Sequence, residues 1–218
     1  MRKRTLAATA ATAACGLVLT VAGQASASTG GVLTVGAAGS GATNVNVGDV
    51  LTGPISSNFV FTTSSGKITC TSGKFTATDS TNGAVGTSAT ESITQLHADA
   101  ANCTTTISGT TSVVSVEING TANGKVTDGA SPTLHVTNLD EKVTMKTILL
   151  TNVVCDFGVT GTNEIDGALS NTTNGVTFTS QAVSKISGSS LCPTTGTFSG
   201  GIAPITDTTQ SSLKTFVN

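Results

Sequence analysis

Apolar and polar residues alternate with a period of two along much of this chain, which predicts β-strands because successive side chains of a strand point to opposite faces. In the segment TLHVTN, Leu134 and Val136 lie on one face and His135 lies on the other. The same alternation predicts an apolar face in three further segments, formed by Phe59 and Phe61; by Val114, Val116 and Ile118; and by Val153, Cys155, Phe157 and Val159. We therefore expect an all-β fold, an antiparallel β-sandwich or barrel.

Turn residues separate these segments. Asn-Gly or Asp-Gly pairs begin at positions 82, 119, 123, 128, 166 and 174, and each pair predicts a turn. Ser72-Gly73, between KITCT and KFTAT, is short enough for a two-residue hairpin turn. The best candidate for one short helix or turn is the segment ATESITQLHADAANC, residues 89–103. The pattern thus predicts strands joined by tight turns, with at most one short helix.

Four cysteines occur in two similar segments of the chain. Cys70 and Cys155 each begin a Cys-x-x-Gly motif, and each is followed by an Asn-Gly pair and a Thr-Ser pair at the same offset. Each segment ends at a second cysteine, Cys103 or Cys192. An even number of cysteines in an exported chain indicates disulfides, and the absence of a short Cys-x-x-Cys disfavours a metal site. The similarity favours pairing Cys70 with Cys103 and Cys155 with Cys192, so that the domain is disulfide-stabilised.

The similar segments also bear on domain organisation. We expect a single β domain over residues 43–218, with a pseudo-repeat that covers 58–126 and 133–205. Two small tandem domains joined near 127–133 are the alternative, although no long linker is present there. Residues 28–42 are rich in glycine, and we expect them to be poorly ordered.

The N-terminus has the three parts of a secretory signal peptide. A basic segment, MRKR, precedes an apolar run that ends at Ala25-Ser26-Ala27, a small-x-small cleavage site. We predict a signal peptide over residues 1–27, which would also remove Cys15. A retained anchor is disfavoured because the run is interrupted by Thr and Gly and is shorter than the roughly 20 strongly apolar residues that a span needs. The prediction is a secreted, extracellular protein with no transmembrane segment after cleavage.

Cleavage changes the charge of the chain. Arg2, Lys3 and Arg4 are lost, so seven lysines and no arginine remain against twelve acidic residues, a net charge of about −5. This balance disfavours nucleic acid and anionic membranes as partners. Threonine makes up roughly a fifth of the mature chain, whereas Trp and Tyr are absent. Because small aliphatic residues and seven Phe must fill the core, we expect the disulfides to compensate for a thin core.

No catalytic motif is complete. Gly-x-Ser-x-Gly is absent, and the phosphate-loop-like GTANGKV at 120–126 is one residue short and ends in Val126 in place of Ser or Thr. His97 and His135 occur in unrelated contexts and are interpreted as surface histidines. Without Trp or Tyr for stacking, a sugar-binding site is also disfavoured. We therefore predict no catalytic residues and no cofactor.

One acidic turn could furnish oxygen ligands for calcium. The segment NEIDG contains Asn163, Glu164 and Asp166, which are residue types that coordinate Ca²⁺. The ordered spacing of an EF-hand loop is missing, and Asp-Gly is also an ordinary turn signal. We therefore predict no metal centre, with these three residues as the calcium candidates.

The cysteine-containing motifs resemble a family. ITCTSG, then ANCT about 30 residues later, then VVCDFGVTG and SSLCPTTGTFSGGI are similar to small secreted actinobacterial proteins that are described only as exported proteins of unknown function. The resemblance covers most of the mature chain. It implies an exported, β-rich protein with four cysteines, and it brings no catalytic residues.

We expect a cell-envelope or extracellular structural or binding protein whose partners are other extracellular components. One alternative is a secreted hydrolase whose acids are gathered only by the fold, and another is an inhibitor or toxin-like module that presents one rigid loop. A cleft that gathers two acids, or an acid and a histidine, would favour the hydrolase.

Overall fold

The computed structural model describes residues 30–39 and 42–218, and the alternating segments form strands throughout this part of the chain. The predicted signal peptide, residues 1–27, lies outside the described residues. The strands are β1 (Leu33–Val35), β2 (Thr43–Asn44), β3 (Val50–Thr63), β4 (Gly66–Cys70), β5 (Gly73–Asn82), β6 (Ser88–Ala98), β7 (Cys103–Thr105), β8 (Thr110–Ile118), β9 (Ala122–Thr127), β10 (Thr133–Thr137), β11 (Asp140–Thr147), β12 (Asn152–Gly158), β13 (Glu164–Ser170), β14 (Gly175–Gly188), β15 (Thr195–Ile202), β16 (Thr206–Asp207) and β17 (Leu213–Val217).

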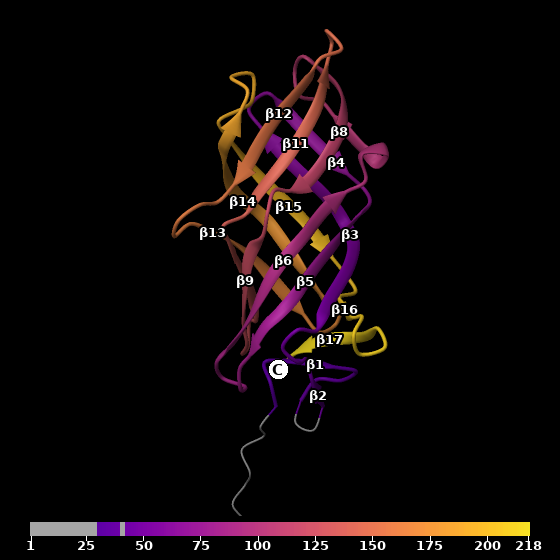
Figure 1. Ribbon diagram of the computed structural model, residues 1–218, viewed down its shortest axis with the longest axis vertical. Coiled ribbons are helices and arrows are strands. Elements are labelled where there is room, and N and C mark those ends of the chain that lie inside the picture. Colours follow the sequence, from indigo (N-terminus) through magenta and orange to yellow (C-terminus); the bar gives the residue numbers. More distant parts are fainter. Residues whose placement is uncertain (1–29, 40–41) are drawn as a thin grey trace, which may run out of the picture.

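Eight long barrel strands run up and down and close into an antiparallel barrel (Figure 1). Several of them consist of two shorter strands in line: β4 pairs with the second half of β3 and β5 with its first half. The order around the barrel is β3, β4–β5, β6–β7, β8–β9, β10–β11, β12–β13, β14 and β15–β16. The ring closes where β15 pairs with β3, with Phe198 opposite Phe61 and Ile202 opposite Ile55. The all-β prediction is confirmed, and the architecture is the barrel.

The inward faces agree with the alternation in most strands. Leu134, Val136, Cys155 and Phe157 are all buried, as predicted. Val114 is an exception, because it is exposed while its neighbour Val113 is buried. The register between β8 and β11 shifts at this point, since Ser115 faces Thr144 and Val113 faces Met145. This β-bulge turns Val114 outward, which a strict period of two cannot anticipate.

Three predicted local features differ from the structure wholly or in part. In the segment 89–103, the candidate for a short helix or turn, residues 89–98 belong to strand β6, and only Ala100–Asn102 form a 3₁₀ turn, η1. Ser72-Gly73 is not a hairpin turn, because β4 and β5 run in the same direction along β3. The pairs Asn123-Gly124 and Asp166-Gly167 lie inside strands β9 and β13. At Gly167 a Cβ atom would lie 2.3 Å from Val176 Cγ2. A glycine is therefore needed here because of close packing, and not because the chain turns.

A small sheet covers the lower end of the barrel as drawn in Figure 1. Strand β1 pairs with β2 on one side and with β17 on the other, with Leu33 opposite Val217. Strand β1 belongs to the glycine-rich segment 28–42, for which we expected poor order, and its Leu33 and Val35 are buried against the base of the barrel. Within the described residues, no helix is long and apolar enough to cross a membrane.

Both disulfides have the predicted pairing. Cys70 and Cys103 are directly opposite each other on β4 and β7, with their Cα atoms 4.0 Å apart. Cys155 of β12 is bonded to Cys192, which follows β14, with a Cα–Cα distance of 5.7 Å. Each bridge closes its own segment of the sequence, and each segment forms a set of adjacent strands in one closed barrel.

Candidate functional site

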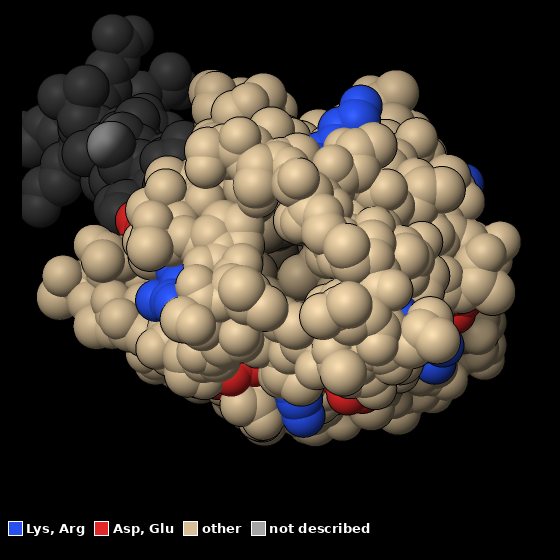
Figure 2. Space-filling view, turned by 90° about the horizontal axis from the view of Figure 1, so that it is seen from above, with Lys and Arg blue, Asp and Glu red and all other residues tan. Residues whose placement is uncertain are grey.

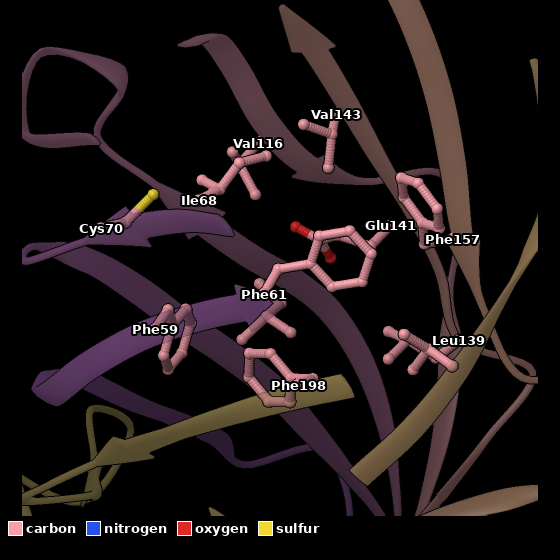
Figure 3. A pocket seen from close by; sticks show the side chains of 12 residues that line it. Phe59, Phe61, Ile68, Cys70, Val116, Leu139, Glu141, Val143, Phe157 and Phe198 are labelled. Atoms are coloured by element: carbon pink, nitrogen blue, oxygen red, sulfur yellow. The ribbon is translucent and has the colours of Figure 1, made fainter. Parts of the chain in front are cut away.

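Inward-facing apolar side chains leave a cavity in the upper half of the barrel (Figure 3). Its volume, measured as the space open to the centres of water molecules, is about 60 Å³. Figure 2 looks onto the upper end of the barrel and shows a hollow at its centre, between the loops that join the strands. The cavity is lined by Phe59, Phe61, Ile68, Cys70, Leu96, Val116, Leu139, Glu141, Val143, Phe157, Val183 and Phe198.

Four of these lining residues are phenylalanines that contact one another in pairs. The rings of Phe59 and Phe198 meet edge to face with centroids 5.2 Å apart, and those of Phe61 and Phe157 are 4.4 Å apart. They come from strands β3, β12 and β15, so the pairs bridge different parts of the wall. Aromatic faces and edges therefore form much of the surface that a bound molecule would meet.

Among the described residues that line the cavity, Glu141 is the only one with an ionisable carboxyl group. It belongs to the inward face of β11, where it follows Leu139 and precedes Val143, and Figure 3 shows its carboxyl group among the Phe rings. Its Oε2 atom is buried without a hydrogen-bond partner in the described part of the chain. Burial, and then the charges of Asp140 and Glu117, raise the pKa of Glu141 well above its usual value. The neutral acid is thus favoured, and its hydroxyl can donate one hydrogen bond into the cavity.

The rim of the upper end is also apolar. The turn between β11 and β12 exposes three successive side chains, Ile148, Leu149 and Leu150, which are 67%, 79% and 72% accessible. Leu191, in the loop between β14 and β15, is 74% accessible. Exposed large apolar side chains of this kind commonly mark binding surfaces. Molecules that approach this end of the barrel therefore meet apolar surface before the cavity.

Four acidic residues are buried at the lower end of the barrel: Asp49, Asp79, Glu91 and Asp207. Asp79 and Glu91 face each other across β5 and β6, and both point inward. Asp49 and Asp207 are held together by Gln210, whose Nε2 donates to Asp49 Oδ2 at 2.6 Å and lies 3.3 Å from Asp207 Oδ2. This lower cluster lies outside the upper cavity, since none of its members lines that cavity.

Asp79 is the most unusual member of the lower cluster. It is 1% accessible, and neither carboxyl oxygen has a hydrogen-bond partner within the described residues. Burial, followed by the charges of Asp49 and Asp207, raises its pKa to about 6. Burial and the neighbouring Asp79 raise the pKa of Glu91 to about 7. Both groups therefore retain protons at a pH where an exposed carboxyl group is ionised.

The calcium candidates are only partly brought together. Glu164 and Asp166 lie on the outer face of β13, next to His135 of β10. His135 Nδ1 is 2.7 Å from Asp166 Oδ1 and 3.5 Å from Glu164 Oε1. Asn163 lies in the preceding turn, where its backbone N–H group donates to the Thr160 carbonyl oxygen at 3.3 Å. The structure thus joins two of the predicted acids with a histidine that the sequence placed in an unrelated context.

This outer-wall group bears on the hydrolase alternative, because it combines a histidine with two acids. The hydroxyl group of Thr127 is 3.5 Å from His135 Nε2, and His135 and Glu164 line a groove on the outer wall of the barrel. The structure thus brings a histidine and an acid together in a surface groove that is separate from the upper cavity. Neither a family model, nor a curated protein, nor a solved structure matches this chain.

Proposed function

We propose that this protein is a secreted binding protein that holds one compact, largely apolar ligand in the upper cavity, with Glu141 as its single polar anchor. The buried, unpartnered Oε2 of Glu141 in an otherwise apolar cavity carries the proposal. A buried polar group without a partner costs roughly 1–3 kcal/mol, and a ligand that supplies the partner removes that cost. Eight-stranded barrels have interiors just wide enough for side chains or for one small ligand.

The size of the cavity limits the ligand. Since a water molecule needs roughly 10–15 Å³ measured in this way, the 60 Å³ corresponds to a few heavy atoms. A larger ligand requires the rings of Phe59, Phe61, Phe157 and Phe198 to rotate. The neutral acid of Glu141 selects molecules that carry a hydrogen-bond acceptor, such as a carbonyl oxygen. The proposed ligand class is therefore a compact apolar molecule with one acceptor group.

Three features support a role outside the cell. Residues 1–27 have the pattern of a signal peptide. The two disulfides are typical of proteins that fold in an oxidising compartment. The resemblance to exported actinobacterial proteins agrees with both. The proposed ligand and any partner are therefore extracellular or cell-envelope components.

A matched pair of ligands tests the role of Glu141. 2-Butanone and 2-methyl-1-butene have nearly the same shape and only a few heavy atoms, but only 2-butanone carries a carbonyl acceptor. We expect the wild-type protein to bind 2-butanone about tenfold more tightly, because one buried hydrogen bond contributes roughly 1–1.5 kcal/mol. Binding is measured by NMR, from the shifts of the Phe ring protons, which no Trp or Tyr signals overlap.

Two variants complete this test. Glu141→Leu removes the donor and should abolish the preference for 2-butanone, whereas Glu141→Gln keeps a donor and should retain part of it. Far-ultraviolet circular dichroism establishes that both variants are folded. If neither ligand shifts the cavity Phe signals at millimolar concentration, or if Glu141→Leu keeps the preference, the proposed function is wrong.

A further inference from the structure

The outer wall of the barrel carries three side chains whose nitrogen and oxygen atoms converge. His135, Glu164 and Asp166 each offer one such atom, and the three atoms lie within 4.8 Å of one another. The shorter separations are 2.7 Å and 3.5 Å, both measured from His135 Nδ1. Ligand atoms that bind one tetrahedral ion at about 2.0–2.2 Å are roughly 3.3–3.6 Å apart, so small rotations of these side chains bring the three atoms to ligand separations.

The strands hold these three residues in fixed relative positions. His135 is directly opposite Asp166 in the β10–β13 pairing, and Glu164 is two residues from Asp166 on the same outward face. The backbone N–H group of Asp166 donates to Gln181 Oε1 at 2.7 Å, which connects this position to β14. Since both strands belong to a closed barrel, the three side chains are presented from a rigid wall.

The second ring nitrogen of His135 also has a neighbour. Thr127 Oγ1 lies 3.5 Å from His135 Nε2. If Nδ1 binds a metal ion, the ring proton is on Nε2 and can donate to this hydroxyl group, which fixes the tautomer. Without a metal ion, Nδ1–H donates to Asp166 instead.

The charges around the group also favour a cation. Within residues 30–39 and 42–218, His135 is the only side chain that forms an ion pair with Glu164 or Asp166. Lys125 is opposite His135 on β9, and Lys185 lines the same surface groove as Glu164, but within the described residues neither lysine forms a salt bridge with Glu164 or Asp166.

We propose that His135, Glu164 and Asp166 bind a divalent transition-metal ion, with Zn²⁺ as the best match. One imidazole nitrogen and two carboxylate oxygens suit Zn²⁺, whereas Ca²⁺ takes six to eight oxygen ligands. Three protein ligands leave the fourth position of a tetrahedral ion for water. This site differs from the calcium candidates of the sequence in its metal and in its third ligand.

Isothermal titration of Zn²⁺ into the mature protein, prepared without a histidine tag, tests the site. We expect one ion per chain, and an affinity for Ca²⁺ at least about a hundredfold lower. His135→Ala and Asp166→Asn should each weaken Zn²⁺ binding by more than about tenfold, because each loses one of only three ligands. All three side chains point outward, so the fold should be retained, which circular dichroism checks.

The second histidine of the chain provides a matched control. His97 Nε2 lies 3.5 Å from Asp99 Oδ1 on the surface, but within the described part of the chain no second carboxylate completes a group of three there. His97→Ala should therefore leave Zn²⁺ binding unchanged. The proposal is overturned if the wild-type protein shows no binding at 100 µM Zn²⁺, if His135→Ala binds as the wild type does, or if His97→Ala weakens binding equally.

Discussion

Raising the pH from 5 to 8 is expected to destabilise the protein by several kcal/mol, because Asp79 and Glu91 must then ionise inside the barrel. Their pKa values in the folded protein are about 6 and about 7, against 3.8 and 4.5 for exposed groups. Between these values the folded chain binds more protons than the unfolded chain, so the free energy of unfolding falls as the pH rises. A shift of two units in one group corresponds to roughly 3 kcal/mol.

Denaturant unfolding at several pH values measures this slope. Asp79→Asn and Glu91→Gln, alone and together, should flatten the curve and raise the stability at pH 8, since a neutral amide replaces a buried charge. Asp128→Asn, which changes an acid in the surface loop between β9 and β10, serves as the control and should leave the slope between pH 5 and 7 almost unchanged. If the free energy of unfolding is constant or increases between pH 5 and 8, Asp79 and Glu91 are not buried as protonated acids, and this prediction is wrong.

Removing either disulfide is expected to lower the free energy of unfolding by about 3–4 kcal/mol. The bridges join residues that are 33 and 37 positions apart, so each limits the freedom of a long loop in the unfolded chain. Stability in domains is typically about 5–15 kcal/mol, and a core without Trp or Tyr has little in reserve. Loss of both bridges should therefore leave the barrel largely unfolded at 37 °C.

The measurement compares the wild type with two double variants, Cys70→Ala with Cys103→Ala and Cys155→Ala with Cys192→Ala. Thermal unfolding of the wild type with and without reductant provides the corresponding test of both bridges at once. An unchanged melting temperature after full reduction would show that the bridges do not compensate for the thin core.

Much of the fold could be predicted because its signals are local. Alternation and turn residues indicated strands, and the repeated cysteine segments indicated both disulfides. Ring closure has no local signal, since the pairing of β15 with β3 depends on the number and tilt of all eight barrel strands. The Asp166-Gly167 pair was misleading because its glycine provides room for Val176 instead of forming a turn.

The candidate sites differ in how much of each could be inferred from the sequence. Glu141 could have been found, because the alternation that includes Leu139 and Val143 assigns it an inward position. Asp79 and Glu91 could have been found in the same way. The approach of His135 to Asp166 could not, because it depends on the pairing of β10 with β13, whose partners are 31 residues apart in the sequence.

Closure of the barrel by its last long strand has a consequence for how the chain is made. A nascent chain that ends before Thr195 lacks β15, so both β3 and β14 keep a free edge that can pair with another chain. The complete ring can form only after the final segment has been synthesised and, for an exported chain, translocated. Stalled or truncated products are therefore the species in which aggregation and proteolysis will concentrate during biogenesis.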